Sequence, residues 1–286
     1  IVGEIMKRFK SVSKKKKIQR KIIIFLLEII ISLLIVIFIK NNFKLSESKI
    51  KYLTYSYLGK MERKKEMIKN EIKVFNERAP NVYIYNTHQT EKYAYNKVNS
   101  YNLDYDVYFA SFILKSYLND FGILSTVEDE KVSKVLSDKG LTYKDSYIAS
   151  RFLLEKAKEN NNDLKYFIDL HRDSATYEMT TCKYDGKSYA KILFVLGMEF
   201  EGYGENEKMI NYLNEKLKSI NPCLSRGVSK KSGKGVNGIY NEDFDKNLIL
   251  IEVGGQYNNI IEVSNTLEIF AKILSLYINE DSNEKT

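Results

Sequence analysis

From Pro80 onward, short apolar runs alternate with longer segments in which apolar residues recur at helical spacing. The runs are rich in branched and aromatic side chains and predict buried strands at Val82–Tyr85, Ile123–Val127, Tyr166–Leu170, Ile192–Leu196 and Leu248–Val253. The longer segments predict helices at Leu103–Phe121, Asp145–Lys158, Glu205–Ile220 and Asn259–Ile278. Such alternation, with strands that are apolar nearly throughout, indicates an α/β fold with a mostly parallel sheet covered by helices on both faces. Ligands of such sheets bind beyond the carboxyl ends of the strands.

A longer apolar run, Ile22–Ile39, precedes this domain, and Glu28 and Ser32 are its only polar residues. As a helix it spans roughly 27 Å at about 1.5 Å per residue, close to the thickness of a membrane's hydrocarbon core. Residues 1–21 carry nine basic side chains and one acidic one, which predicts a cytoplasmic tail and an extracytoplasmic main domain. Residues 40–44 contain no small-residue cleavage site, so we predict a single-pass membrane anchor and not a cleaved signal peptide.

The segment between the apolar run and Pro80, residues 40–79, is predicted as an extracytoplasmic stalk. Within it, Met61–Phe75 repeats apolar residues at helical spacing. A helix at this place would equally suit the start of the globular domain. We place the main domain at residues 80–286.

The formal net charge of +8 resembles that of a nucleic-acid-binding protein. However, residues 1–21 account for all of this excess, and the charges of the remaining chain cancel. A balanced domain does not offer the phosphate-neutralising surface that nucleic acid requires. The sequence therefore predicts no nucleic-acid partner.

Polar side chains that suit a metal site follow three of the predicted strands. The two histidines of the chain, His88 and His171, each come after a strand, and Glu91 stands three residues beyond His88. A third strand carries Glu252, and a buried acid is rare unless it is paired or functional. A catalytic zinc ion takes three protein ligands and leaves one position open. We predict that His88, Glu91 and His171 bind Zn²⁺ and that Glu252 is the general base; the alternative is that the histidines are ordinary polar residues.

Several neighbouring residues could support this chemistry. Asp169 could orient the ring of His171, and either Arg172 or Arg226 could stabilise an oxyanion. The glycine-rich stretch Gly227–Gly238 departs from the Walker pattern and is predicted as a flexible surface loop. Cys182 and Cys223 could pair in an oxidising compartment, but two cysteines far apart in the chain are too weak a signal to predict a disulfide.

The segments that contain these residues resemble the stage II sporulation protein P family of endospore-forming bacteria. In family order they are YIYNTHQTEKY (Tyr83–Tyr93), FIDLHRDS (Phe167–Ser174), ILFVLG (Ile192–Gly197), LSRGV (Leu224–Val228) and LILIEVGGQYN (Leu248–Asn258). The resemblance implies a membrane-anchored, zinc-dependent peptidoglycan hydrolase that cleaves the N-acetylmuramoyl-L-alanine amide and also stem-peptide cross-links. It further implies septal wall remodelling during engulfment in sporulation, with the stage II sporulation proteins D and M as partners. A looser similarity to zinc amidases and carboxypeptidases implies a metal site of His, Glu and His with a late Glu as base.

Two departures from these patterns leave alternatives open. Asn86 stands where similar sequences often have a further histidine, so any role of that position in metal binding or proton transfer is in doubt. In related amidases the carboxylate ligand lies further along the chain, which makes Asp104 or Asp106 the alternative to Glu91. Two other functions are compatible with the sequence: a catalytically inactive wall-binding scaffold of a sporulation complex, and a zinc carboxypeptidase that trims exported peptides.

Overall fold

The structure is a computed structural model that describes residues 79–94, 96–98, 101–103 and 105–283. They belong to one compact unit, residues 76–286. The basic tail, the apolar run at 22–39 and the stalk up to residue 78 lie outside the described residues, and so does Asp104. Among the helices that the structure describes, none is both long and apolar enough to cross a membrane.

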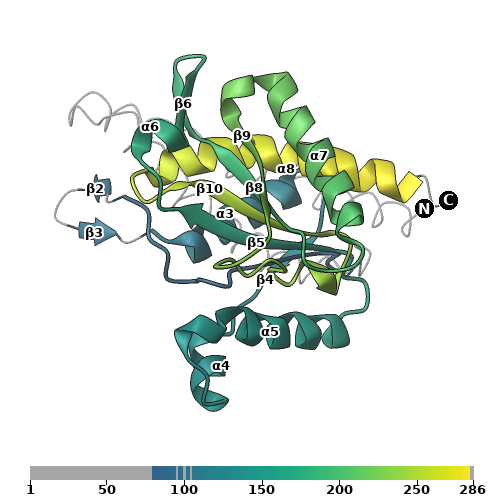
Figure 1. Cartoon of the computed structure of the whole chain (residues 1–286). Helices are drawn as coiled ribbons and strands as arrows, with labels where there is room; N and C mark the ends of the chain where they lie inside the picture. Colours follow the sequence, from purple (N-terminus) through teal and green to yellow (C-terminus); the bar gives the residue numbers. More distant parts are fainter. Residues whose placement is uncertain (1–78, 95, 99–100, 104, 284–286) are drawn as a thin grey trace, which may run out of the picture. The chain divides into compact units, whose positions relative to one another are not determined.

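A six-stranded sheet forms the centre of the domain, with the strand order β4-β1-β5-β10-β8-β9 (Figure 1). Its strands are β1 (Val82–Tyr85), β4 (Ser125–Val127), β5 (Tyr166–Asp173), β8 (Ile192–Gly197), β9 (Ser225–Lys231) and β10 (Leu248–Gly255). All neighbouring strands run parallel except β8 and β10, which are antiparallel. The prediction of an α/β fold with a mostly parallel sheet is therefore confirmed.

Helices cover both faces of this sheet. Successive side chains of each strand point to opposite faces, and the apolar ones pack into a core on each side. Val82 and Ile84 of β1 belong to the large core formed with α3 (Val107–Asp120), α7 (Tyr203–Ile220) and α8 (Ile260–Asn283). Tyr83 and Tyr85 point the other way, into the core under α5 (Ser146–Asn160). Figure 1 shows α5 below the sheet with α4 (Val132–Asp138) beside it, and α7 and α8 above.

The alternation along β5 and β10 decides which face carries the polar residues. Ile168 and Leu170 of β5, like Ile249 and Ile251 of β10, enter the large core. Asp169, His171 and Glu252 occupy the intervening positions and must therefore point toward the α5 face. The apolar core thus orients the polar residues of both strands in one direction.

The prediction of a surface loop over Gly227–Gly238 is wrong in its first part. Residues Ser225–Lys231 form strand β9, which pairs with β8 at the edge of the sheet. An edge strand has one neighbour and is exposed along its other side, so it needs no continuous apolar run, and its residues here are only half-buried. The polar sequence SRGVSKK consequently gave no strand signal.

Four further strands of the described chain were not predicted. They are short and lie outside the central sheet: strands β2 (Asn96–Val98) and β3 (Tyr101–Leu103), and the hairpin of β6 (Thr181–Tyr184) and β7 (Lys187–Ala190). The hairpin follows the short helix α6 (Tyr177–Thr180). It lies between β5 and β8, at the same end of the sheet as the carboxyl end of β5.

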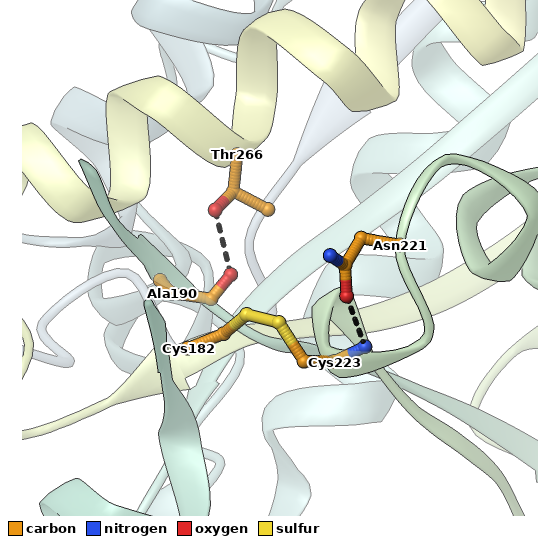
Figure 2. The surroundings of a disulfide bond; sticks show 5 residues. All are labelled: Cys182, Ala190, Asn221, Cys223 and Thr266. Carbon is orange, nitrogen blue, oxygen red and sulfur yellow. Dashed lines mark hydrogen bonds between the residues drawn. A yellow bond between two sulfur atoms is a disulfide. The ribbon is translucent and has the colours of Figure 1, made fainter. Parts of the chain in front are cut away.

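Cys182 and Cys223 form a disulfide, which the sequence did not predict (Figure 2). Cys182 lies on β6, and Cys223 lies in the 3₁₀ turn Pro222–Leu224 that leads from α7 into β9. The fold brings their Cα atoms to 5.8 Å, within the range that a disulfide requires. Figure 2 also shows Thr266 of α8, whose hydroxyl donates to the Ala190 carbonyl at 2.7 Å and holds the end of β7. Only this tertiary packing pairs the cysteines.

We expect Cys182→Ser/Cys223→Ser to lower the free energy of unfolding by about 2–4 kcal/mol, because the cross-link restricts the unfolded chain. The protein should nevertheless fold, since the β6–β7 pairing and the Thr266–Ala190 hydrogen bond remain. The measurement is denaturant unfolding of the native and variant proteins with and without a thiol reductant. The variant is its own control, since reductant should leave it unchanged. Equal stability of the native protein under both conditions would contradict the expectation.

Candidate active site at the carboxyl ends of the strands

His171 and Glu252 are neighbours in the sheet. They are paired in the parallel register of β5 and β10 and point to the same face. His171 is buried, and the Oε2 atom of Glu252 is a buried oxygen without a hydrogen-bond partner in the described part of the chain. Two residues 81 positions apart in the sequence (252 − 171 = 81) therefore lie side by side at one end of the sheet.

His88 joins them from the turn that follows β1. Its ring lies edge-on to the ring of His171, with 5.4 Å between the ring centroids. The Nδ1 atom of His88 is buried and has no hydrogen-bond partner among the described residues. Burial and the nearby His171 lower the pKa of His88, which favours the neutral form that binds metals.

Glu91, the predicted third ligand, lies close to His171. Its Oε2 atom lies 3.5 Å from His171 Nδ1 and accepts a hydrogen bond of 3.1 Å from the backbone N–H of Arg172. Burial raises the pKa of Glu91. The interactions with His171 and with the backbone of Arg172 together outweigh this effect, so the pKa lies below its usual value. The alternative, Asp106, uses its carboxylate to cap α3 by accepting from the backbone N–H of Phe109 at 2.8 Å.

Taken as they stand, the described residues contain no group of three or more His, Cys, Asp or Glu side chains arranged as a metal site. Two separations nevertheless approach those of tetrahedral zinc. With zinc–ligand distances near 2.0–2.1 Å, two ligand atoms lie about 3.4 Å apart and two imidazole centroids about 5 Å apart. The Glu91–His171 distance of 3.5 Å and the centroid separation of 5.4 Å are close to these values. The donor types and the unpartnered His88 nitrogen therefore fit a zinc ion.

Asp169 fixes the far side of the His171 ring. It is fully buried, and its Oδ1 atom lies 2.9 Å from His171 Nε2 and accepts from the backbone N–H of Thr87 at 2.9 Å. Its Oδ2 atom accepts from the Thr87 hydroxyl at 2.6 Å. Burial lowers the pKa of His171, but the carboxylates of Asp169 and Glu91 outweigh it and raise the pKa well above its usual value.

The contacts of Asp169 extend into α5. The Thr87 hydroxyl lies 2.8 Å from the hydroxyl of Ser150, which accepts from the Asn241 side-chain amide at 3.0 Å. The same amide donates to the carbonyl of Tyr147 at 2.9 Å. A continuous set of hydrogen bonds thus runs from the loop before β10 through helix α5 and the end of β1 to Asp169, which lies against the ring of His171. The sequence contained no signal for Ser150 or Asn241.

Asn86 has a structural role. Its side-chain amide donates to the Leu170 carbonyl at 2.6 Å, and its oxygen accepts from the Ser111 hydroxyl at 3.1 Å. The residue is buried and joins β1, β5 and α3. Its polar atoms are engaged in this packing and lie on the face opposite His171.

The two arginines proposed for oxyanion stabilisation lie in different surroundings. Arg226, near the start of β9, forms an ion pair with Asp173, two residues beyond His171. Arg172 donates instead to the carbonyl of Lys92 at 2.9 Å and to that of Asp173 at 3.3 Å. The positive charge of Arg226 is among the interactions that lower the pKa of Glu252, the candidate base.

The ionisation of Glu252 is balanced by its surroundings. Burial raises its pKa to about 7, the positive charges of His171 and Arg226 oppose this, and the carboxylates of Glu91 and Asp173 add to it. A carboxyl group with a pKa near neutrality can both accept and return a proton. Sequence reasoning identified Glu252 as an acid that needed an explanation, and these contacts supply its electrostatic setting.

These observations define an α/β protein with a histidine–carboxylate site at the carboxyl ends of parallel strands. The chain belongs to the family "Stage II sporulation protein P (SpoIIP)", whose model matches residues 38–275. A curated relative from Bacillus subtilis (strain 168), the stage II sporulation protein P, is 34% identical over 200 residues, which make up 68% of this chain and 50% of the relative. The chain therefore spans about half the length of that relative. The family resemblance expected from the sequence motifs is confirmed.

Two solved structures are similar at a much lower level. The N-acetylmuramoyl-L-alanine amidase AmiC2 of Nostoc punctiforme is 12% identical with a TM-score of 0.36, covering 69% of this chain and 97% of that one. The CwlD amidase from Clostridioides difficile, solved in complex with the GerS lipoprotein, is 15% identical with a TM-score of 0.41, covering 70% and 97%. At these TM-scores, nothing about the site is inferred from the two amidase structures.

Glu242, in the 3₁₀ turn Glu242–Phe244, is a buried acid that sequence reasoning missed. Its Oε2 atom accepts from the backbone N–H of Gly197 at 2.5 Å, whereas Oε1 has no partner among the described residues. Burial raises the pKa of Glu242 to about 9, although the bond to Gly197 opposes the shift. The group is therefore protonated in the folded protein at neutral pH.

We expect Glu242→Gln to flatten the dependence of stability on pH. Because the folded pKa of about 9 exceeds the usual 4.5, the stability that Glu242 contributes is fully present below pH 4.5 and is lost as pH rises toward 9. The variant cannot ionise, so its stability relative to the native protein should increase between pH 5 and pH 9. The measurement is urea unfolding at pH 5, 7 and 9, with the exposed Glu201→Gln as control. Parallel curves for Glu242→Gln and the native protein would refute the assignment.

Proposed function

We propose that the protein is a zinc-dependent peptidoglycan hydrolase that cleaves the N-acetylmuramoyl-L-alanine amide and also stem-peptide cross-links. The observation that carries this proposal is the meeting of His88, Glu91 and His171 beside Glu252 at the carboxyl end of the sheet. Membership of the stage II sporulation protein P family supports a role in the cell wall of sporulating cells.

The roles of the residues follow from their positions. His88, Glu91 and His171 would hold the zinc ion, which when bound polarises the scissile carbonyl and acidifies the attacking water. Asp169 keeps the His171 ring in one orientation, so that Nδ1 faces Glu91. Glu252, with its pKa near 7, would remove a proton from the attacking water and return it to the leaving amine nitrogen. Arg226 would stabilise the negative charge that develops on the carbonyl oxygen.

The cellular setting belongs to the same proposal. The apolar run at 22–39 would anchor the protein in the cell membrane with its N-terminus in the cytoplasm and the hydrolase domain outside. From there it would act on septal peptidoglycan during engulfment, together with the stage II sporulation proteins D and M. The departure at Asn86 gave some weight to the alternative of a catalytically inactive scaffold, and the hydrogen bonds of Asn86 offer a structural reason for that residue.

The test of the mechanism is the release of stem peptides from purified cell-wall sacculi by the full chain in detergent, with the products identified by mass. Glu252→Gln should lower kcat by about 10²- to 10⁴-fold, the usual contribution of a general base, while the zinc content is retained. His88→Ala should lose both zinc and activity, and a chelator should inhibit the native protein. The exposed Glu201→Gln is the matched control for Glu252→Gln. Undiminished release by either site variant would overturn the mechanism, and stoichiometric zinc without any release would favour the scaffold.

A second comparison identifies the third zinc ligand. Glu91→Gln should reduce zinc affinity because it replaces a carboxylate beside His171 with a neutral amide. Asp106→Asn should retain zinc, and its cost of about 1 kcal/mol or less in stability would come from a weaker cap on α3. Zinc affinity is measured by competition with a chromogenic chelator. Zinc loss in Asp106→Asn together with zinc retention in Glu91→Gln would reverse the assignment.

A further inference from the structure

An exposed tyrosine is stacked directly on one of the candidate zinc ligands. The ring of Tyr143 lies over the ring of His88 with 5.1 Å between centroids and 27° between planes. Tyr143 is nevertheless 64% exposed. One face of its ring is therefore covered by His88, and much of the rest of the side chain is open to a ligand.

Two more tyrosines continue this aromatic surface. Tyr147, at the start of α5, lies edge-on to His88 with 5.7 Å between centroids. Tyr240, in the loop before the 3₁₀ turn of Glu242, lies edge-on to Tyr147 at 5.4 Å. We call Tyr143, Tyr147 and Tyr240 the tyrosine wall. They come from two separate chain segments that meet beside His88.

The tyrosine wall is held in place by hydrogen bonds. Thr142 and Asp145 form a reciprocal cap around the short 3₁₀ turn of Tyr143, and the Ser146 hydroxyl donates to the Tyr143 carbonyl at 2.6 Å. On the other segment, Tyr240 and Asn241 both have positive φ, 54° and 62°, a costly conformation for residues other than glycine. The hydrogen bonds of Asn241 to Tyr147 and Ser150 hold this loop against α5.

Arg226 and Asp173 form another flank of the site, whose chemistry differs from that of the tyrosine wall. It presents an ion pair, whereas the tyrosine wall presents aromatic faces. Aromatic faces pack against the C–H groups on the apolar face of a pyranose ring, and ligand sites in general combine aromatic surfaces with a few polar groups. The two flanks therefore suit the two parts of a glycopeptide.

We propose that Tyr143 is a sugar-stacking residue that binds the pyranose ring of the muramoyl unit next to the scissile amide. This inference rests on the proposed function and specifies its substrate contacts. In a muramoyl peptide the lactyl ether separates the sugar ring from the amide carbonyl by only a few bonds. A ring stacked on Tyr143 consequently brings that carbonyl to the neighbourhood of His88, which Tyr143 itself contacts.

The first test compares two substrates. Tyr143→Ala should raise KM for stem peptides that are still attached to glycan strands by roughly 3- to 10-fold, the effect of one aromatic stack. The ratio of kcat/KM for this substrate to kcat/KM for sugar-free cross-linked peptides should fall by the same factor. Tyr143→Phe should restore the ratio, because stacking does not need the hydroxyl. Tyr184→Ala, at another exposed tyrosine, on the β6–β7 hairpin, is the control. An unchanged ratio, or an equal loss on both substrates, overturns the inference.

The second test does not depend on hydrolysis. The chain contains no tryptophan, so Tyr143→Trp in the Glu252→Gln protein introduces a single indole at the proposed sugar-binding position. Titration with peptide-free strands of alternating N-acetylglucosamine and N-acetylmuramic acid should change its fluorescence in a saturable way. Tyr184→Trp in the same background should show no change. No response at position 143 contradicts the sugar contact, while stem-peptide release by the native protein would still support the proposed function.

Discussion

The buried carboxylate of Asp169 is the interaction on which the candidate site depends. Enclosed away from solvent, it accepts hydrogen bonds from the backbone and the hydroxyl of Thr87 and lies 2.9 Å from His171 Nε2. A buried charge without such partners would be very costly. The fold therefore cannot change the end of β1 or the orientation of His171 independently. The same hydrogen bonds reach Ser150 and Asn241 and thereby connect the covering helix α5 with the loop that carries Tyr240.

The register of β5 and β10 provides the second constraint. Parallel pairing aligns His171 with Glu252, and the apolar residues on either side direct both side chains to the α5 face. The position of Glu252 thus follows from the burial of Ile251 and Val253 in the opposite core. Its pKa of about 7 follows in turn chiefly from burial, which the carboxylates of Glu91 and Asp173 reinforce and the positive charges of His171 and Arg226 oppose.

The sequence was sufficient for the parts of the structure that repeat a strong pattern. Fully buried strands such as β1 and β5 can be recognised in the sequence as apolar runs, and the polar residues directly after them indicate the site. The edge strand β9 and the β6–β7 hairpin escaped prediction because strands with an exposed side or a single partner need no apolar run. Ser150, Tyr143 and Asn241 were missed for another reason, because each lies on a segment distant in sequence from its partner. Only tertiary packing brings Tyr143 to His88, Ser150 to Thr87 and Asn241 to Ser150. The pairing of Cys182 with Cys223 is a long-range contact of the same kind.

The antiparallel direction of β8 has a consequence for the Arg226 flank of the site. Because β8 runs opposite to β10, both β8 and β9 begin at the rim of the sheet where β5 and β10 end. The hairpin that leads into β8 and the turn that leads into β9 are thereby brought together, and each contributes one cysteine to the bond between them. Arg226 consequently lies three residues after Cys223, which the disulfide joins to the β6–β7 hairpin. That side of the rim gains a rigidity that depends on the redox conditions in which the chain matures.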